Sequence, residues 1–206
     1  MSGKTSKRKS SSNANSSNKK VKTENQTDKK GHWAFGLLSA VNDPKLLITE
    51  DDKITIIKDK YPKAEVHYLV LPKEDIKSLK AVQKEHTSLL KHMEKVGERI
   101  FKEKHPGMSF KMGYHSEPSM TRLHLHVISD DMKSDCLKTK KHWNSFNTDF
   151  FLNSTQVREQ LESLGKIIIP SAEKCKEWMS KPLKCHKCDF FPLNMPDLKR
   201  HLSDKH

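Results

Sequence analysis

The sequence is poor in cysteine and in apolar residues, and both shortages exclude classes of protein. Its 206 residues contain only four cysteines, two of which are separated by two residues and lie near histidines. This is typical of a metal site in a reducing compartment and not of a disulfide framework. No apolar run approaches the roughly 20 residues that cross a bilayer, and no secretory signal is visible at the start. We therefore expect a soluble intracellular protein.

Negative charge is also in short supply. The chain carries 39 Lys and Arg against 26 Asp and Glu, a formal net charge of +13 at pH 7. Such an excess favours a polyanionic partner, nucleic acid first and acidic membrane second. Because 33% of the residues are hydrophobic and 32% are charged, the core must be concentrated in part of the length. The chain has room for one domain and a small module.

Residues 1–31 contain almost no apolar side chains and are predicted to form a disordered basic tail. Nine Lys and Arg against Glu24 and Asp28 give this segment a net charge of +7. Two basic clusters, at residues 7–9 and 19–22, are spaced like a bipartite nuclear-import signal, which predicts a nuclear protein. The alternative is a solvating tail that holds DNA non-specifically through counterion release. Both can be true.

Residues 122–129, Arg-Leu-His-Leu-His-Val-Ile-Ser, alternate polar and apolar side chains, which is the period of a half-buried β-strand. The alternation predicts that Arg122, His124 and His126 point to one face. Imidazole serves phosphorus chemistry near neutral pH as a nucleophile, a proton carrier or a metal ligand. This face is therefore predicted to line a site. The alternative is the solvated outer face of an edge strand.

The other periodicities predict an α+β domain. β-rich segments predict four further strands, at residues 46–49, 54–58, 66–71 and 110–114. Apolar residues recur at helical spacing over residues 79–101, which predicts a long amphipathic helix lying on the sheet. Short helices are predicted at 33–41 and 157–164, the second ended by Gly165, and a short strand at 166–169.

The last residues of the sequence predict a small metal-binding module. Two cysteines and two histidines follow the spacing Cys185-x2-Cys188-x12-His201-x4-His206. This is the spacing of a ββα zinc finger, with two thiolates on a hairpin and two imidazoles one helical turn apart. So few residues cannot hold a core without metal, so a structural Zn²⁺ is predicted.

Several motifs together resemble the aprataxins, a family of the histidine-triad superfamily. Residues 124–129 look like the histidine-triad strand, and residues 59–73 resemble the nucleotide-binding strands of the superfamily. Residues 140–148, together with the terminal finger, narrow the match to the aprataxins. The resemblance covers about residues 32–206.

The resemblance implies the architecture of the folded part. It implies an α+β histidine-triad fold, an antiparallel sheet with a long packed helix, joined to a small ββα zinc finger. The catalytic domain is expected at residues 32–150, a connector of helix and strand packed on it at 151–182, and the finger at 183–206.

Aprataxins are DNA 5′-adenylate hydrolases of strand-break repair, so the resemblance also implies an activity. The chain is expected to remove AMP from 5′-adenylated DNA ends, which abortive ligation leaves, in single-strand break repair. By resemblance, His124 is the nucleophile and forms a covalent AMP–histidine, and no catalytic metal is required. The resemblance gives further catalytic roles to His126 and Arg122 on the non-bridging oxygens, His67 at the border of the site, Ser119 on the phosphate and His115 beside the leaving group.

Binding residues follow from the same resemblance. The adenylate is expected to meet Asp59 at its ribose, with Lys63 and Ser119 also binding the nucleotide. The residues expected to meet nicked or adenylated DNA are Trp33, His115, Lys141 and His142. Trp33 is expected to act as a wedge that stacks on the end of the duplex, and the alternative is that it packs in the core. AMP is the expected product, and the basic tail is expected to offer contacts to repair proteins.

One residue departs from the family pattern and leaves other functions open. The first triad position is Arg122 and not histidine, and a guanidinium donates hydrogen bonds but cannot accept them. We expect this change to alter the rate or the pH optimum. One alternative is a small-molecule phosphoramidase or dinucleoside-polyphosphate hydrolase of the superfamily. Another is a DNA-binding protein with a decayed triad, although a single finger covers only about 3 base pairs.

Overall fold

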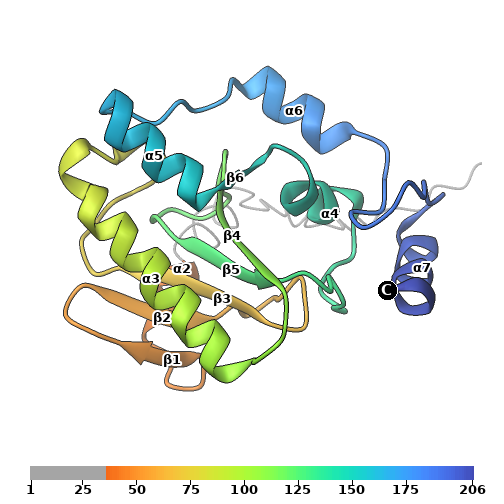
Figure 1. The fold of residues 1–206 in the computed structure, drawn as a ribbon, viewed down its shortest axis with the longest axis horizontal. Helices are drawn as coiled ribbons and strands as arrows, with labels where there is room; N and C mark the ends of the chain where they lie inside the picture. Colours follow the sequence, from red (N-terminus) through yellow and green to blue (C-terminus); the bar gives the residue numbers. More distant parts are fainter. Residues whose placement is uncertain (1–35) are drawn as a thin grey trace, which may run out of the picture.

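The computed structural model describes residues 36–206, in which six antiparallel strands form one sheet (Figure 1). The order of the strands in the sheet is β1-β2-β3-β5-β4-β6. The strands are β1 Leu47–Glu50, β2 Ile54–Lys58, β3 His67–Pro72, β4 Phe110–His115, β5 Leu125–Ser129 and β6 Phe151–Asn153. The basic tail at 1–31 and the wedge Trp33 lie outside the described residues.

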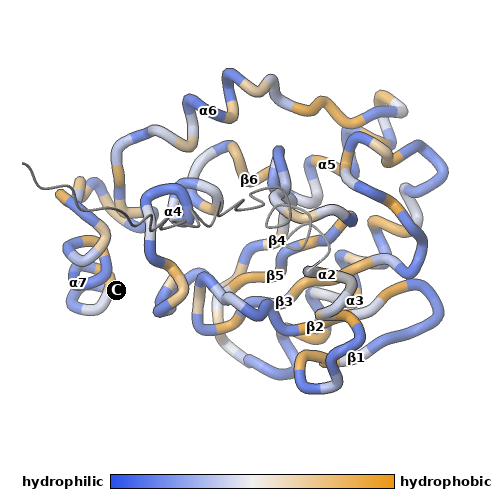
Figure 2. The backbone as a smooth tube through the Cα atoms, turned by 180° about the vertical axis from the view of Figure 1, so that it is seen from behind, coloured by the Kyte–Doolittle hydropathy of each residue, from blue (hydrophilic) through white to orange (hydrophobic). Residues whose placement is uncertain are grey.

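Helices surround this sheet on both faces. The helices are α2 Gly36–Val41, α3 Thr87–Lys104, α4 Lys140–Asn147, α5 Ser154–Leu164, α6 Ala172–Ser180 and α7 Met195–Lys205. Helices α3 and α5 lie over one face of the sheet, and α2 lies over the other (Figures 1 and 2). No helix in the described range is long and apolar enough to cross a membrane.

Strand alternation separates the two faces of the sheet. On β3, Tyr68 and Val70 pack in the core beneath α3, whereas Leu69 and Leu71 pack with Leu37 of α2. Figure 2 shows that the central strands are mostly hydrophobic, as expected for strands covered on both faces. His67 lies two residues before Leu69 on β3, and His126 of β5 pairs with Leu69, so both side chains lie on the α2 face.

Helix α3 is shorter than the helical spacing predicts. The predicted helix over residues 79–101 is wrong at its start, because two 3₁₀ turns, Leu79–Ala81 and Lys84–His86, precede α3. Val82 between them has an extended backbone (φ −73°, ψ 131°). Leu79 and Val82 are nevertheless buried. Their helical spacing therefore reflects residues buried in short turns and not a continuous helix.

Two other segments also differ from their predictions. The predicted strand at 166–169 is wrong, since these residues form no ladder. Ile167 and Ile169 pack against the core while Ile168 is exposed, so the alternation reflects burial without strand pairing. The boundary expected after residue 150 separates β6 from the sheet to which it belongs, because β6 pairs with β4.

Gly113 allows β4 to lie close to β6. It pairs with His126 on one side and Asn153 on the other. A Cβ at this position would lie 2.4 Å from the carbonyl oxygen of Leu152 and 2.7 Å from the ring of Phe151. The absence of a side chain therefore lets β6 and its aromatic residue lie against the middle of the sheet.

Replacing Gly113 by alanine is expected to destabilise the protein. Overpacking a well-filled contact costs about 1–3 kcal/mol, which for a chain of this size lowers the melting temperature by roughly 5–10 °C. A thermal scan checks this, with Gly36→Ala as the matched control, because a Cβ at Gly36 meets nothing within 4 Å. Equal melting temperatures for the two variants would contradict the close approach.

Candidate active site and metal centre

A cavity of about 630 Å³ opens on the α2 face of the sheet, between α2, the ends of β2, β3 and β4, and α4. Its wall contains most of the residues that the sequence singles out. Those that line it are Asp59, Lys63, His67, His115, Ser119, His124, His126, Lys141 and His142. Arg122 does not line it. A cavity of this size fits the range of small-ligand sites.

His124 has one ring nitrogen engaged and one available. Its Nδ1 lies 2.8 Å from the carbonyl oxygen of Arg122. A carbonyl oxygen only accepts hydrogen bonds, so Nδ1 carries the proton and Nε2 keeps its lone pair. Burial lowers the pKa of His124 below its ordinary value of 6.5. The neutral ring therefore presents a nucleophilic nitrogen at neutral pH.

His67 and His126 form a directed hydrogen-bond chain. The backbone N–H of Lys63 donates to Nδ1 of His67 over 3.2 Å, so the proton of His67 is on Nε2. That Nε2 lies 2.9 Å from Nδ1 of His126 and donates to it. The proton of neutral His126 is therefore on its Nε2, which is buried and has no partner among the described residues.

Burial keeps both of these rings neutral. It lowers the pKa of His67 to about 4, against the opposing charge of Asp59, whose Oδ2 lies 3.4 Å from Nδ1. It also holds the pKa of His126 well below the ordinary value, with the neighbouring histidines and Lys63 acting in the same direction. An unpaired N–H at this position is available to an acceptor that enters the cavity.

His115 reaches the same cavity from the end of β4. Its ring lies 4.4 Å from that of His126 and 4.6 Å from that of Phe146, between centroids. Burial lowers its pKa to about 3, and the neighbouring histidines and Lys63 add to this effect. Four imidazoles thus gather at one wall of the cavity, contributed by β3, β4, β5 and the residue just before β5.

The structure corrects the prediction for Arg122. Strand β5 begins only at Leu125, and Arg122 has a positive φ of 108°, so strand alternation does not extend to it. Its Nη2 donates to the carbonyl oxygens of Pro72 and Lys73, at 2.8 and 3.0 Å. Arg122 therefore serves His124 through its backbone carbonyl, and its side chain caps the end of β3.

Replacing Arg122 by alanine or histidine is therefore expected to change the reaction rate at the site by less than about threefold. Loss of the two bonds to carbonyl oxygens is expected to cost about 1 kcal/mol of stability. Steady-state kinetics beside a thermal scan check both effects. A rate loss of 100-fold or more with the fold intact would mean that the guanidinium acts on the substrate.

Two lysines and a histidine lie at the rim of the cavity, and burial together with Lys63 lowers the pKa of His142 below its ordinary value. Lys141 is exposed, and Lys63 and His142 are partly exposed. Thr139 accepts a hydrogen bond from the backbone N–H of His142 and begins α4 there. These groups offer positive charge and N–H donors to an anion that extends out of the cavity.

The resemblance assigned Lys141 and His142 to the site, but no helix was predicted at α4, and Ser145 and Phe146 were not singled out. Ser145 and Phe146 line the cavity, and the ring of Phe146 lies 5.3 Å from that of His126. Phe146 and Trp143 are buried. The signal was present, since Thr139 is a good N-cap and the two aromatic residues are three apart.

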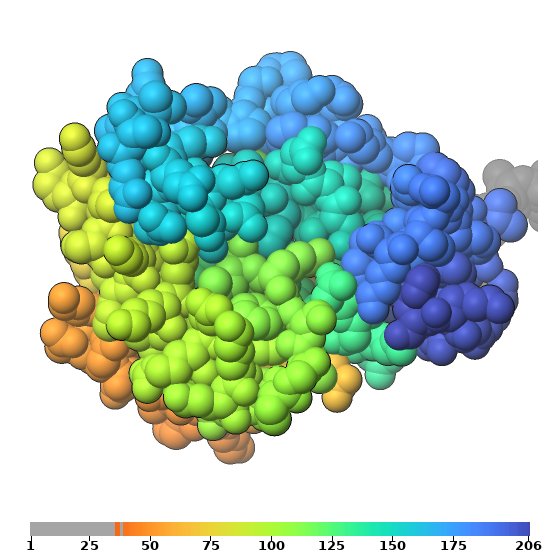
Figure 3. All heavy atoms as spheres, in the orientation of Figure 1, coloured from red at the N-terminus to blue at the C-terminus, as the bar shows by residue number. Residues whose placement is uncertain are grey.

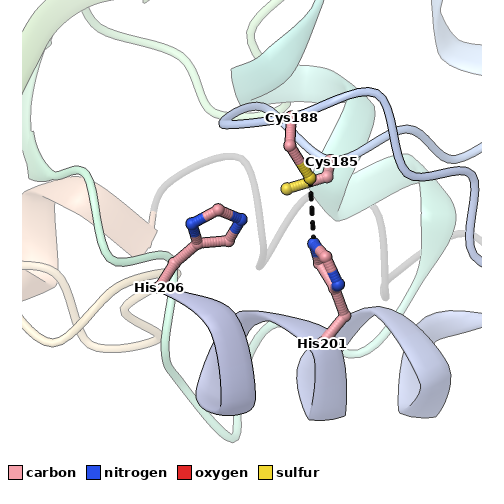
Figure 4. Close-up of side chains that lie close together, drawn as sticks. All are labelled: Cys185, Cys188, His201 and His206. Atoms are coloured by element: carbon pink, nitrogen blue, oxygen red, sulfur yellow. Dashed lines mark hydrogen bonds between the residues drawn. The ribbon is translucent and has the colours of Figure 1, made fainter.

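The C-terminal cysteines and histidines gather as a metal centre. One ligand atom from each of Cys185, Cys188, His201 and His206 lies within 4.8 Å of the others (Figure 4). Sγ of Cys188 lies 3.1 Å from Nε2 of His201. Two thiols and two imidazoles converging from a turn and a helix fit a tetrahedral Zn²⁺. The residues that would hold it are these four, and bound zinc would supply folding stability.

The finger departs from the predicted ββα form. Helix α7 is present, but residues 183–194 contain no strand. A backbone hydrogen bond from Cys185 N–H to the carbonyl oxygen of Phe190, 2.9 Å long, closes the turn in place of a hairpin. The segment between the cysteines and α7 is too irregular for ladder pairing, partly because Pro192 cannot donate.

The finger shares one hydrophobic core with the sheet. Leu198 and Leu202 of α7 cluster with Ile128 of β5 and Trp143 of α4. The indole N–H of Trp143 donates to the carbonyl oxygen of Lys184 over 3.0 Å. Figure 3 shows the C-terminal segment packed directly against the rest of the molecule. The finger is therefore part of the same folded body.

Comparisons with known proteins agree with this architecture. Residues 32–142 match the family described as "Scavenger mRNA decapping enzyme C-term binding", and residues 147–205 match "C2HE / C2H2 / C2HC zinc-binding finger". The structure of Hnt3 in complex with DNA and guanosine superposes with a TM-score of 0.64, at 23% identity, over 82% of this chain and 93% of that one. This likeness confirms the predicted fold class of an antiparallel sheet with a packed helix and a C-terminal finger.

Relatives in sequence cover most of the chain. The aprataxin of Gallus gallus is 48% identical over 174 residues, which are 84% of this chain and 54% of that protein. The aprataxin-like protein of Saccharomyces cerevisiae is 32% identical over 169 residues, 65% of this chain and 78% of that protein. The chain spans about half the length of the aprataxins from chicken, zebrafish and sea squirt that it matches.

Proposed function

Because the chain belongs to the aprataxin family, within the histidine-triad superfamily, we propose that it is a hydrolase that removes AMP from 5′-adenylated DNA ends. The observation that carries the proposal is the state of His124. Its Nδ1 proton is held by the carbonyl oxygen of Arg122, so Nε2 faces a nucleotide-sized cavity as a free nucleophile.

The reaction follows from the positions of the rings. Nε2 of His124 attacks the adenylate phosphorus, so that a P–N bond forms and the P–O bond to the 5′-phosphate of the DNA breaks. The buried Nε2–H of His126 donates to a non-bridging oxygen, where negative charge gathers. Water then attacks the same phosphorus, which breaks the P–N bond, releases AMP and restores His124. His115 stands beside the leaving 5′-phosphate.

The cavity wall provides a place for each part of the adenylate. Apolar side chains of α2, β2 and β3 form one wall, which suits the faces of a purine. They are Leu37, Ala40, Ile57 and Leu69, with Met120 beside them. Asp59 lies at the edge, where its carboxylate suits the ribose hydroxyls. Lys63 and Ser119 suit the phosphate.

The hydrogen bond between His67 and His126 bears on the question of metal. The carboxylate of Asp59 and these two rings are close enough to hold an ion. Nε2 of His67 and Nδ1 of His126, however, are 2.9 Å apart in the hydrogen bond between the rings, and no thiolate of the kind that zinc prefers is among the three groups. We therefore assign the reaction to the imidazoles and cations alone, and zinc to the finger.

DNA is the substrate class that the charge of the chain favours. The net charge of +13 and the exposed Lys141 at the rim of the cavity suit the phosphate backbone beyond the 5′ end. The Hnt3 structure in complex with DNA supports the same assignment. A role in nuclear single-strand break repair, with repair proteins meeting the tail, is part of the proposal.

Incubation with two adenylated substrates tests the proposal. A nicked duplex carrying a 5′-adenylate is expected to yield AMP and a 5′-phosphate end, and at equal low concentration it is expected to react at least about 100-fold faster than an AMP phosphoramidate of a small amine. Equal or higher turnover of the small substrate would favour a small-molecule hydrolase. Binding of the DNA without release of AMP would indicate a DNA-binding protein that lacks the hydrolase activity.

A further inference from the structure

One aromatic side chain of the finger, Phe191, is exposed and lies outside the core of the finger. Phe191 is 62% exposed and Leu193 is 92% exposed, the two highest values among large apolar side chains of the described residues. Phe190 fills the aromatic position of the finger by stacking on the zinc-ligand candidate His201, with ring centroids 4.2 Å apart and 22° between the planes. Phe191 is therefore not part of the core of the finger.

A cation accompanies the exposed ring. Nζ of Lys184 lies 5.4 Å from the centroid of Phe191, and it also pairs with the exposed carboxylate of Asp189 at 2.8 Å. Lys184 is about half exposed. A lysine beside an exposed aromatic ring suits a single strand of nucleic acid, because its bases can stack on the ring and its phosphates attract the cation.

Contacts connect this ring with the rim of the cavity. Lys140, next to the rim residue Lys141, donates from Nζ to the carbonyl oxygen of Ser180 over 3.1 Å. The exposed Lys181 follows Ser180 directly. The carbonyl oxygen of Lys184 in turn accepts from the indole of Trp143 on the same helix α4. Lys140 and Lys141 of α4 therefore have Lys181 and Lys184 on the segment that packs against the same helix, and α4 lies between β6 and α7 (Figures 1 and 2).

We propose that Phe191, with Lys184 beside it, is a stacking site for an unpaired base of the DNA whose 5′ end occupies the cavity. A base inside a duplex hides both faces in the stack, and only the terminal pair leaves one face open, so an exposed ring favours unpaired over paired DNA. The lysines along α4 hold the backbone between the two sites by charge, and Phe191 adds a contact that does not depend on the base sequence. The proposal rests on DNA as the substrate of the cavity.

The test compares the affinities of wild type and Phe191→Ala for a single strand and for a blunt duplex of equal length, by fluorescence anisotropy. Loss of one stacked base is expected to weaken single-strand binding about 5- to 20-fold. Duplex binding and its salt dependence are expected to stay within about twofold, since no charge is lost. Phe191→Trp is expected to keep the single-strand affinity, and Ile168→Ala, an exposed apolar residue elsewhere, is the matched control.

Several results would overturn the proposal. One is equal single-strand affinity of wild type and Phe191→Ala, and another is an equal loss on both DNA forms. A loss of bound zinc or a lower melting temperature in Phe191→Ala would also overturn it, because either result would mean that the ring has a structural role. Release of AMP from adenylated DNA by wild type is read separately. If AMP is not released but Phe191→Ala still weakens single-strand binding, the proposed hydrolase activity is contradicted and the stacking site is supported.

Discussion

Replacement of His124 by alanine is expected to lower the rate of AMP release at least about 10³-fold, because no other group takes over as the nucleophile. Binding of AMP is expected to weaken less than about tenfold, since the apolar wall and the cations remain. Single-turnover kinetics and AMP titration separate the two effects. His86→Ala is the matched control, because His86 lies outside the cavity and pairs with Glu74 on the surface.

The pH dependence of the wild-type rate follows from the same residue. Burial lowers the pKa of His124 below 6.5, so the nucleophile stays neutral through the neutral range and is protonated only in more acidic solution. The rate is therefore expected to be flat around pH 7 and to fall with decreasing pH only below 6.5. A rate that falls as pH rises through this range would mean that a protonated histidine is required, and would contradict the assignment of the free Nε2.

Removal of zinc is expected to have the second largest effect, on the stability of the whole chain and not of the finger alone. Leu198 and Leu202 are fully buried in a cluster that also contains Trp143 and Phe146. Loss of two such side chains from the core is expected to lower the free energy of unfolding by about 3–6 kcal/mol, and with it the melting temperature by roughly 10–20 °C. Because Phe146 also packs on His126, AMP binding is expected to weaken as well.

Thermal scans and AMP titration with and without a chelator check this, beside Cys188→Ser. Cys136→Ser is the matched control, since Cys136 is a partly buried cysteine outside the metal centre. A chelated protein that has lost its zinc but keeps its melting temperature and its AMP affinity would contradict the shared core. A finger that merely unfolds by itself would lower neither.

Much of the sheet could be predicted because burial on both faces leaves a plain pattern. Strand β2 begins and ends where predicted, at Ile54–Lys58, β3 is shifted by one residue from the predicted 66–71, and β4 ends one residue later than predicted. Strand β6 was missed because it has only three residues and pairs through Gly113, whose role depends on a close approach between strands. Local periodicity carries no information of that kind.

The site could be predicted in its residues but not in its hydrogen bonds. The motif resemblance placed His67, His115, His124 and His126 near one another, and the structure brings them together. Their roles remain predictions. Arg122 shows the limit, because alternation assigned it to the same face, whereas its positive φ turns the side chain toward the end of β3. A backbone conformation of that kind leaves no periodic signal.

The joining of the finger to α4 could not be predicted either. The cysteine and histidine spacing predicts a metal centre whatever the finger packs against. That Trp143 donates to Lys184, and that α7 completes a core with β5, depends on contacts between distant segments. For the same reason Phe191 could not be recognised as the spare aromatic until Phe190 was seen on His201.

The most direct test of the covalent mechanism is rapid quenching of the protein in alkaline denaturant during turnover of a nicked, 5′-adenylated duplex, followed by mass spectrometry of the peptide that contains His124 and His126. The mechanism predicts an adduct of one adenylyl group on His124 that is stable to mild base, is lost on acid treatment, and is absent from His124→Ala. An adduct on another histidine, or steady AMP release with no adduct at any time, would contradict it.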